Sequence, residues 1–329
     1  MSHVHPVPLT IAVAQAAPVF LDRTATLEKA CELIVDAGRA GARLIVFPEA
    51  FIPGYPVWVW TVPPSETGLL NDLYAQWLAN AVTIPSDVTD RLCRIAQHAR
   101  INVVIGLNEC DTEAGGATCY NTLLYIDAQG QLLGKHRSLV LTGAERLVWA
   151  QGDGSTLQVH KLPFGVISGL IGGENYLPLA RYALYAWGTQ IYLAASSEHG
   201  EPWRSTLRHI AKEGHVYVIG LGMLLRTEDL PENASVKRFA AASMGPWIHA
   251  GDSAILTPDG EFLSGPVREQ ETILYAQIDP QELCGSKWML DVAGHDARSD
   301  IFQLTVHREH HLIMLTKEAE SAENGEMVP

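Results

Sequence analysis

Seven runs of apolar, largely β-branched residues recur along the chain and predict its strands. They cover residues 9–15, 42–49, 101–109, 121–127, 165–171, 190–196 and 216–223. Nearly every position in these runs is apolar, a pattern typical of strands buried on both faces of a sheet. The sequence therefore predicts sheets that are covered on both sides.

Between several of these runs the apolar positions repeat at helical spacing. Helices are predicted over residues 26–41, 90–99 and 202–214, and from Asn175 onward. The helix 202–214 has a proline near its start and a glycine at its end, residues that these two positions favour. Strands that alternate with helices indicate an α/β fold.

Two segments have the turn signals of β-hairpins. Residues 123–136 carry a turn at Ala128-Gln129-Gly130, and residues 253–265 carry one at Pro258-Asp259-Gly260. Hairpins pair their strands antiparallel, whereas strands joined through helices pair parallel. Mixed sheets are therefore expected.

Composition indicates a single domain with a short tail. The chain has 329 residues, of which 47% are hydrophobic, so it can bury one large core. No shift in composition marks a domain boundary, and residues 1–308 are predicted to form one domain. Residues 309–329 are predicted to be a partly mobile tail, because their last 13 residues, 317–329, are polar, acidic and aperiodic.

Charge and cysteine content restrict the partners and the compartment. The net charge is −14 and no run of Lys or Arg occurs, which argues against nucleic acid or an anionic membrane as a partner. Residues 1–10 lack the basic start and apolar run of a signal peptide, and no stretch is apolar enough to span a membrane. The five cysteines follow no disulfide or metal-binding spacing. A cytoplasmic protein is expected, and small molecules or other proteins remain as its partners.

One carboxylate, Glu49, ends the predicted strand 42–49 in the stretch FPEAFIPGYP. It stands beside Phe47, Phe51 and Tyr55, and apolar surroundings raise the pKa of a carboxyl group and suit it to proton transfer. An acid at a strand end also commonly caps a turn or pairs with an arginine. The residues alone leave both interpretations open.

A second polar segment, residues 134–154, sets charged side chains among apolar residues. It reads GKHRSLVLTGAERLVWAQGDG and contains Lys135, Arg137, Glu145 and Arg146. A network of ion pairs and a functional site both account for this pattern.

Four separate stretches of the chain resemble the nitrilase branch of the carbon–nitrogen hydrolase family, and they occur in the same order as in that family. They are FPEAFIPGYP, GKHRSLVLTGAERLVWAQGDGS, GGENYLPLARYALYAWG and GDSAILTPDG, and the likeness spans residues 8–308. The resemblance implies a four-layer α-β-β-α sandwich, a homo-oligomer (a dimer or a larger spiral assembly) and no metal or other cofactor. It also implies hydrolysis of small organic nitriles to a carboxylic acid and ammonia, through a Glu, a Lys and a Cys.

The family's catalytic positions are only partly kept. Glu49 and Glu145 match its two glutamates. The lysine position is occupied by Ser138 and the position of the nucleophilic cysteine by Gly172. Lys135 lies three residues upstream of Ser138 and, because side chains alternate along a strand, is expected to face elsewhere.

Further departures lie in the same neighbourhood. Leu141 replaces a usual proline, Gly173 a tryptophan, and Ser196-Ser197-Glu198 the usual Thr-Trp-Asp. The loss of two large side chains at positions 172 and 173 is expected to open a cavity. Candidate substrate contacts are Tyr55, Gly173, Glu174, Ser196, Ser197 and Glu198. Tyr55, Trp60 and Trp149 either line this cavity or belong to the core.

Other chemistry at these residues is less well supported. Ser138, Ser196 and Ser197 have no histidine placed by a motif, and His199 is only close in sequence. A metal site from Glu49, Glu145, Glu198 and His199 lacks any recognised ligand spacing.

Three functions remain open. The chain is a nitrile hydrolase whose nucleophile and lysine have been altered, an enzyme that uses Glu49 and Glu145 without a covalent intermediate, or a binding or assembly protein without catalysis. The sequence does not separate natural reassignment of the site from deliberate alteration.

Overall fold

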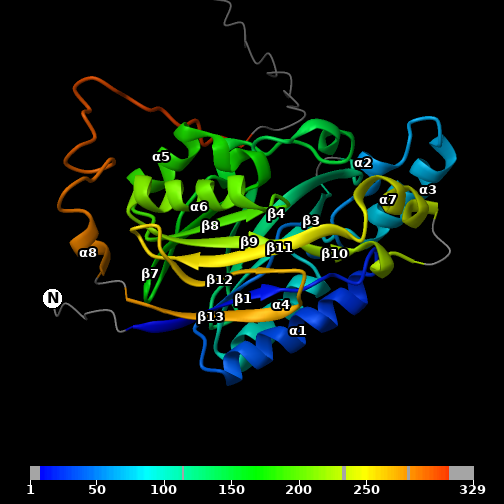
Figure 1. Ribbon diagram of the computed structural model, residues 1–329, viewed down its shortest axis with the longest axis horizontal. Coiled ribbons are helices and arrows are strands. Elements are labelled where there is room, and N and C mark those ends of the chain that lie inside the picture. The colour runs from blue at the N-terminus through cyan, green and yellow to red at the C-terminus, as the bar shows by residue number, and fades with distance from the viewer. Residues whose placement is uncertain (1–7, 113–114, 232–234, 280–281, 311–329) are drawn as a thin grey trace, which may run out of the picture.

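Two β-sheets form the centre of the molecule (Figure 1). The computed structural model describes residues 8–112, 115–231, 235–279 and 282–310. The six-stranded sheet has the order β13-β1-β2-β3-β4-β5. Its strands are β1 (Leu9–Gln15), β2 (Leu44–Val46), β3 (Asn102–Asp111), β4 (Thr118–Ile126), β5 (Leu132–Arg137) and β13 (Thr272–Ile278).

The second sheet has seven strands in the order β10-β11-β9-β8-β7-β6, and β12 pairs with β11. Its strands are β6 (His160–Leu162), β7 (Gly165–Ile171), β8 (Ile191–Ser196), β9 (Tyr217–Gly222), β10 (Leu224–Arg226), β11 (Trp247–Leu256) and β12 (Phe262–Arg268). β7, β8 and β9 run parallel, so the residues that follow β7 and β8 lie at one edge.

Helices cover the outer face of each sheet and give four layers, α-β-β-α. α1 (Arg23–Arg39) and α4 (Asp87–Ala99) pack on the six-stranded sheet, and α5 (Pro178–Ala186) and α6 (Glu201–Gly214) on the seven-stranded one (Figure 1). The remaining helices are α2 (Trp58–Thr61), α3 (Thr67–Asn80), α7 (Ser235–Met244) and α8 (Glu282–Ser286). Short 3-10 turns follow β5 and β7: η1 (Gly143–Leu147) and η3 (Gly172–Tyr176).

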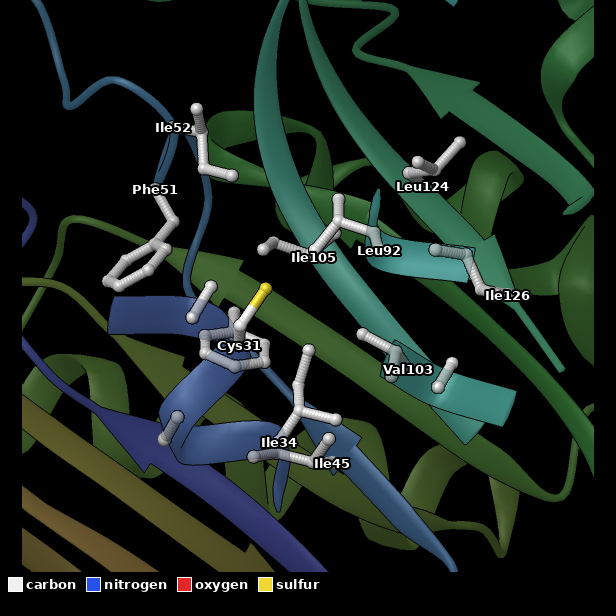
Figure 2. Close-up of a cluster of buried hydrophobic side chains, with 14 of the residues drawn as sticks. Cys31, Ile34, Ile45, Phe51, Ile52, Leu92, Val103, Ile105, Leu124 and Ile126 are labelled. Atoms are coloured by element: carbon white, nitrogen blue, oxygen red, sulfur yellow. The ribbon is translucent and has the colours of Figure 1, made fainter. Parts of the chain in front are cut away.

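Separate apolar layers hold these elements together. Between the sheets, side chains such as Val13 and Val46 meet Ile167 and Leu193. On the outer face of the six-stranded sheet, Cys31 and Ile34 of α1 lie among apolar side chains of the strands, as Figure 2 shows. Both faces of the central strands are therefore buried, which explains their continuous apolar character.

The predicted four-layer fold is confirmed, together with its strands and both hairpins. The run 42–49 gives a shorter strand, Leu44–Val46, and the proline at position 48 offers no amide hydrogen for continued pairing. The helix predicted from Asn175 begins instead at Pro178, after the η3 turn. The single domain over 1–308 stays a prediction, and residues 311–329 of the predicted tail lie outside the described residues.

Candidate active site

Segments that follow the strands of both sheets lie around one cavity. Glu49 is not among the residues that line it, but lines a smaller neighbouring pocket that shares Tyr55 with it. Glu49 follows β2, Gly172 follows β7, and Ser196 ends β8. The cavity has a volume of about 260 Å³. It is lined by Tyr55, Val57, Trp60, Thr142, Glu145, Gly172, Gly173, Ser196, Ser197, Glu198, Met244, Ile248 and His249. Most of the predicted site residues therefore meet in space.

Glu49 is a buried carboxyl group with an unusually high pKa. Only 2% of its surface is exposed. Burial, followed by the charge of Glu145, raises the pKa of Glu49 to about 8, although hydrogen bonds from Asn121 and the Ser197 backbone oppose the shift. The Asn121 amide donates to Glu49 Oε2 at 2.8 Å. Glu49 can therefore give or take a proton near neutral pH.

Glu145 is held beside it at the η1 turn. The backbone N–H of Thr142 donates to Glu145 Oε2 at 2.7 Å, and the Tyr55 hydroxyl donates to Oε1 at 2.8 Å. Burial raises the pKa of Glu145, and these two bonds oppose the rise. Both oxygens are thus occupied, and Glu145 is fixed in orientation while its charge acts on Glu49.

Gly172 leaves open the position where the resemblance places a nucleophile. Its φ is +57°, a left-handed conformation that favours glycine. A Cβ built at Gly172 would stand 3.9 Å from Glu49 Oε2 and within 4 Å of no other atom outside the adjoining residues. Position 172 therefore faces Glu49 across free space. At Gly173, by contrast, a Cβ would meet Thr142 Oγ1 at 2.7 Å.

Ser138 and Lys135 do not supply a cation to this cavity. Ser138 is buried just after β5 and its hydroxyl donates to the Val140 carbonyl at 3.2 Å. Its backbone N–H donates at 2.9 Å to the carbonyl of Asn121, the residue whose side chain donates to Glu49. Lys135 forms an ion pair with Glu109 and lines a different cavity, as its place in the strand alternation predicts.

Glu174 lies beneath the site and does not line the cavity. It is fully buried, and its carboxylate accepts the Ile171 N–H at 2.6 Å and the Leu139 N–H at 2.8 Å. His136 Nε2 lies 2.7 Å from the same carboxylate. The proposed contact with substrate therefore has no geometric support, and Glu174 instead fixes the turn that carries Gly172.

Glu174→Ala is expected to lower the free energy of unfolding by about 3 kcal/mol, because it leaves the His136 ring and two buried N–H groups without their acceptor. Urea unfolding at pH 7 measures the loss. Glu198→Ala, which removes an exposed carboxylate at the rim of the same cavity, is the matched control and is expected to change stability little. Equal losses in the two variants would contradict the supporting role of Glu174.

The other predicted residues divide between the wall and the core. Ser196, Ser197, Glu198, Tyr55 and Trp60 line the cavity. Trp149 instead packs in the apolar cluster around α2, α3 and α7, where its indole N–H donates to Asn108 at 3.0 Å.

Six contributing residues were not identified from the sequence: Val57, Asn121, Thr142, Met244, Ile248 and His249. Asn121 and His249 sit inside strands, where nothing in the apolar pattern separates a residue that faces the site from one that packs in the core. Within the described ranges, no group of three or more His, Cys, Asp or Glu is arranged to hold a metal ion, and no helix is long and apolar enough to cross a membrane.

Comparisons with known proteins identify the family of this chain. A model of the carbon–nitrogen hydrolase family matches residues 10–285. An aliphatic nitrilase of Sinorhizobium fredii is 38% identical over 312 residues, which cover 93% of this chain and 98% of that protein. A bifunctional nitrilase/nitrile hydratase of Nicotiana tabacum is 37% identical over 302 residues, which cover 91% of this chain and 85% of that protein.

Solved structures with the same fold have more distant sequences. Saccharomyces cerevisiae Nit3, a member of branch 10 of the nitrilase superfamily, superposes with a TM-score of 0.70 at 20% identity, over 90% of this chain and 98% of that one. An amidase from Nesterenkonia sp. gives 0.62 at 19% identity, over 86% and 96%. These two structures show the fold of the chain. The family model and the two nitrilase relatives show its family. The chain belongs to the carbon–nitrogen hydrolase family and, within it, to the nitrilase branch.

Proposed function

We propose that this chain acts on a small nitrile or amide with water as the nucleophile, and that Glu49 transfers the protons. No covalent bond forms between protein and substrate at position 172. The observation that carries this proposal is the open space at Gly172, which faces a carboxyl oxygen of Glu49. A glycine offers no nucleophile, whereas a carboxylate beside free space can act on water there.

The proton balance closes with Glu49 alone. The Glu49 carboxylate takes a proton from water as the oxygen bonds to the nitrile carbon, and the electron pair of the broken π bond moves to nitrogen. Glu49 then returns the proton to that nitrogen, and the hydroxyl-imine rearranges to the amide. Because the pKa of Glu49 is about 8, roughly one tenth of it is ionised at pH 7.

A panel of small nitriles and amides tests this proposal. Amide and acid products are measured by mass spectrometry, ammonia by a coupled assay, and the intact protein is weighed during turnover. Product without any protein adduct is expected. An adduct during repeated turnover would contradict the role of Gly172, and ligand binding without any product would favour a non-catalytic binding protein.

The rate is expected to depend on pH through Glu49. Because the ionised form is the base and the pKa of Glu49 is about 8, kcat/KM should rise about tenfold per pH unit below that value and level off above it. Glu145→Gln removes a charge that raises this pKa, so kcat/KM of this variant should level off at a lower pH than in wild type. Profiles that coincide for the two proteins would contradict the coupling of the two carboxyl groups.

The oligomeric state and the compartment are proposed from the family resemblance. We expect a cytoplasmic homo-oligomer, a dimer or a larger assembly, with a small molecule as its substrate. Sedimentation velocity of the full chain tests the first part, and a species of monomer mass at micromolar concentration would contradict it.

A further inference from the structure

A histidine that no sequence motif marks, His249, borders the cavity from β11. Only 7% of its surface is exposed, and it lines the cavity together with Gly172 and Glu145. Its ring meets the ring of Tyr55 edge-on, with centroids 5.2 Å apart and an interplanar angle of 81°. Packing of this kind holds the imidazole in one orientation.

One nitrogen of this ring has no partner. His249 Nε2 is buried and makes no hydrogen bond. Within the described ranges, it is the one buried, unpartnered side-chain nitrogen or oxygen that belongs to a residue lining the cavity. Polar atoms buried in this way cost free energy unless a ligand or water satisfies them. An unsatisfied polar atom in a residue that borders a cavity is therefore a candidate for contact with a ligand.

The protonation of the ring follows from its surroundings. Burial, assisted by nearby His199, lowers the pKa of His249 to about 4, and a bond to the Ser197 backbone opposes the shift. The ring is thus neutral at pH 7. A backbone bond that raises the pKa of a histidine is one in which the ring N–H donates to a carbonyl. A neutral imidazole carries one N–H, and its other ring nitrogen keeps a lone pair that can accept a hydrogen bond.

Two neighbouring residues on the cavity wall, Glu145 and Ser196, already accept hydrogen bonds within the protein. Both oxygens of Glu145 accept hydrogen bonds, from Tyr55 and Thr142. Ser196 Oγ accepts the Glu198 N–H at 3.1 Å. His249 Nε2, which makes no hydrogen bond, adds an unengaged ring nitrogen beside these groups.

We propose that His249 is a specificity-determining residue whose Nε2 accepts a hydrogen bond from a hydroxyl or amino group on the substrate. The preferred substrates are then small nitriles or amides that carry such a donor. The inference takes the nitrile or amide group from the proposed function, but the preference for a donor concerns binding and does not require turnover. A ligand with the donor is expected to bind about tenfold more tightly than the same ligand without it.

Lactamide and propionamide, which differ by one hydroxyl group, test the inference. Their affinities for the full chain are measured by calorimetry or ligand-observed NMR. Wild type is expected to prefer lactamide, and His249→Leu to bind both alike. His249→Gln, which keeps an acceptor oxygen, is expected to retain part of the preference, a rescue that a purely structural role does not predict. Thermal unfolding shows whether both variants remain folded.

A measurement on wild type alone tests the inference even if the variants do not fold. The ¹⁵N resonance of His249 Nε2 is expected to move on addition of lactamide and to stay in place with propionamide. Equal affinities in wild type, a preference that survives in folded His249→Leu, or no binding of either amide overturns the inference. A donor preference without turnover overturns the proposed function alone, and turnover without a donor preference overturns the role of His249 alone.

Discussion

A chain that carries both Gly172→Cys and Ser138→Lys is expected to form a covalent adduct with small nitriles and to release ammonia on the order of 10³-fold faster than wild type, or more. The introduced thiol would start from a Cβ 3.9 Å from Glu49 Oε2 in otherwise free space. A lysine at position 138 would follow β5 next to the Asn121 backbone. A cation there lowers the pKa of a nearby thiol and stabilises charge that develops on the substrate nitrogen.

Intact-protein mass spectrometry during turnover and an ammonia assay measure this gain. Each single substitution is a control, and Gly172→Ala tests whether the left-handed backbone at this position tolerates any side chain, at a cost of about 1 kcal/mol. The thiol should react with iodoacetamide at lower pH when the lysine is present. Turnover restored by Ser138→Lys alone would show that the nucleophile is not at position 172.

The strands and the paired glutamates could be predicted because their signals are local. A strand buried on both faces reads as a continuous apolar run, and Glu49 and Glu145 stand in stretches that resemble the family. α3 and α7 gave no such signal. In each, two residues are fully buried: Leu73 and Trp77 in α3, Val236 and Ala240 in α7. Two buried positions are too few to reveal a helical period.

The positions of Glu174 and His249 could not be predicted from the sequence, for a different reason. Glu174 stays a predicted substrate contact, but the η3 turn directs its carboxylate back to Ile171 and His136. His249 reaches the cavity because β11 brings it there from far along the chain, close to Tyr55. Sequence spacing does not encode such long-range proximity, so no local pattern could reveal it.

Glu49→Gln is expected to reduce turnover by about 10²- to 10⁴-fold, since it removes the proposed proton-transferring group. The same substitution is expected to change how the free energy of unfolding depends on pH. The pKa of Glu49 is about 8 in the folded chain, against about 4.3 for an unfolded glutamate. Between these values the folded state keeps a proton that the unfolded state releases. The contribution of Glu49 is therefore fully present at low pH and is lost as the pH rises toward 8.

Urea unfolding of wild type and Glu49→Gln at pH 5, 6.5 and 8 separates this effect from other titrating groups, because only the difference between the two proteins reports on position 49. That difference is expected to shift in favour of Glu49→Gln by about 3 kcal/mol between pH 5 and pH 8. Glu198→Gln changes an exposed carboxylate on the rim of the cavity. Its free energy of unfolding should change with pH in the same way as that of wild type. If the free energy of unfolding of Glu49→Gln also changes with pH as that of wild type does, Glu49 is not a buried acid with a raised pKa. Its proposed role in proton transfer and the predicted rise of kcat/KM toward pH 8 are then both wrong.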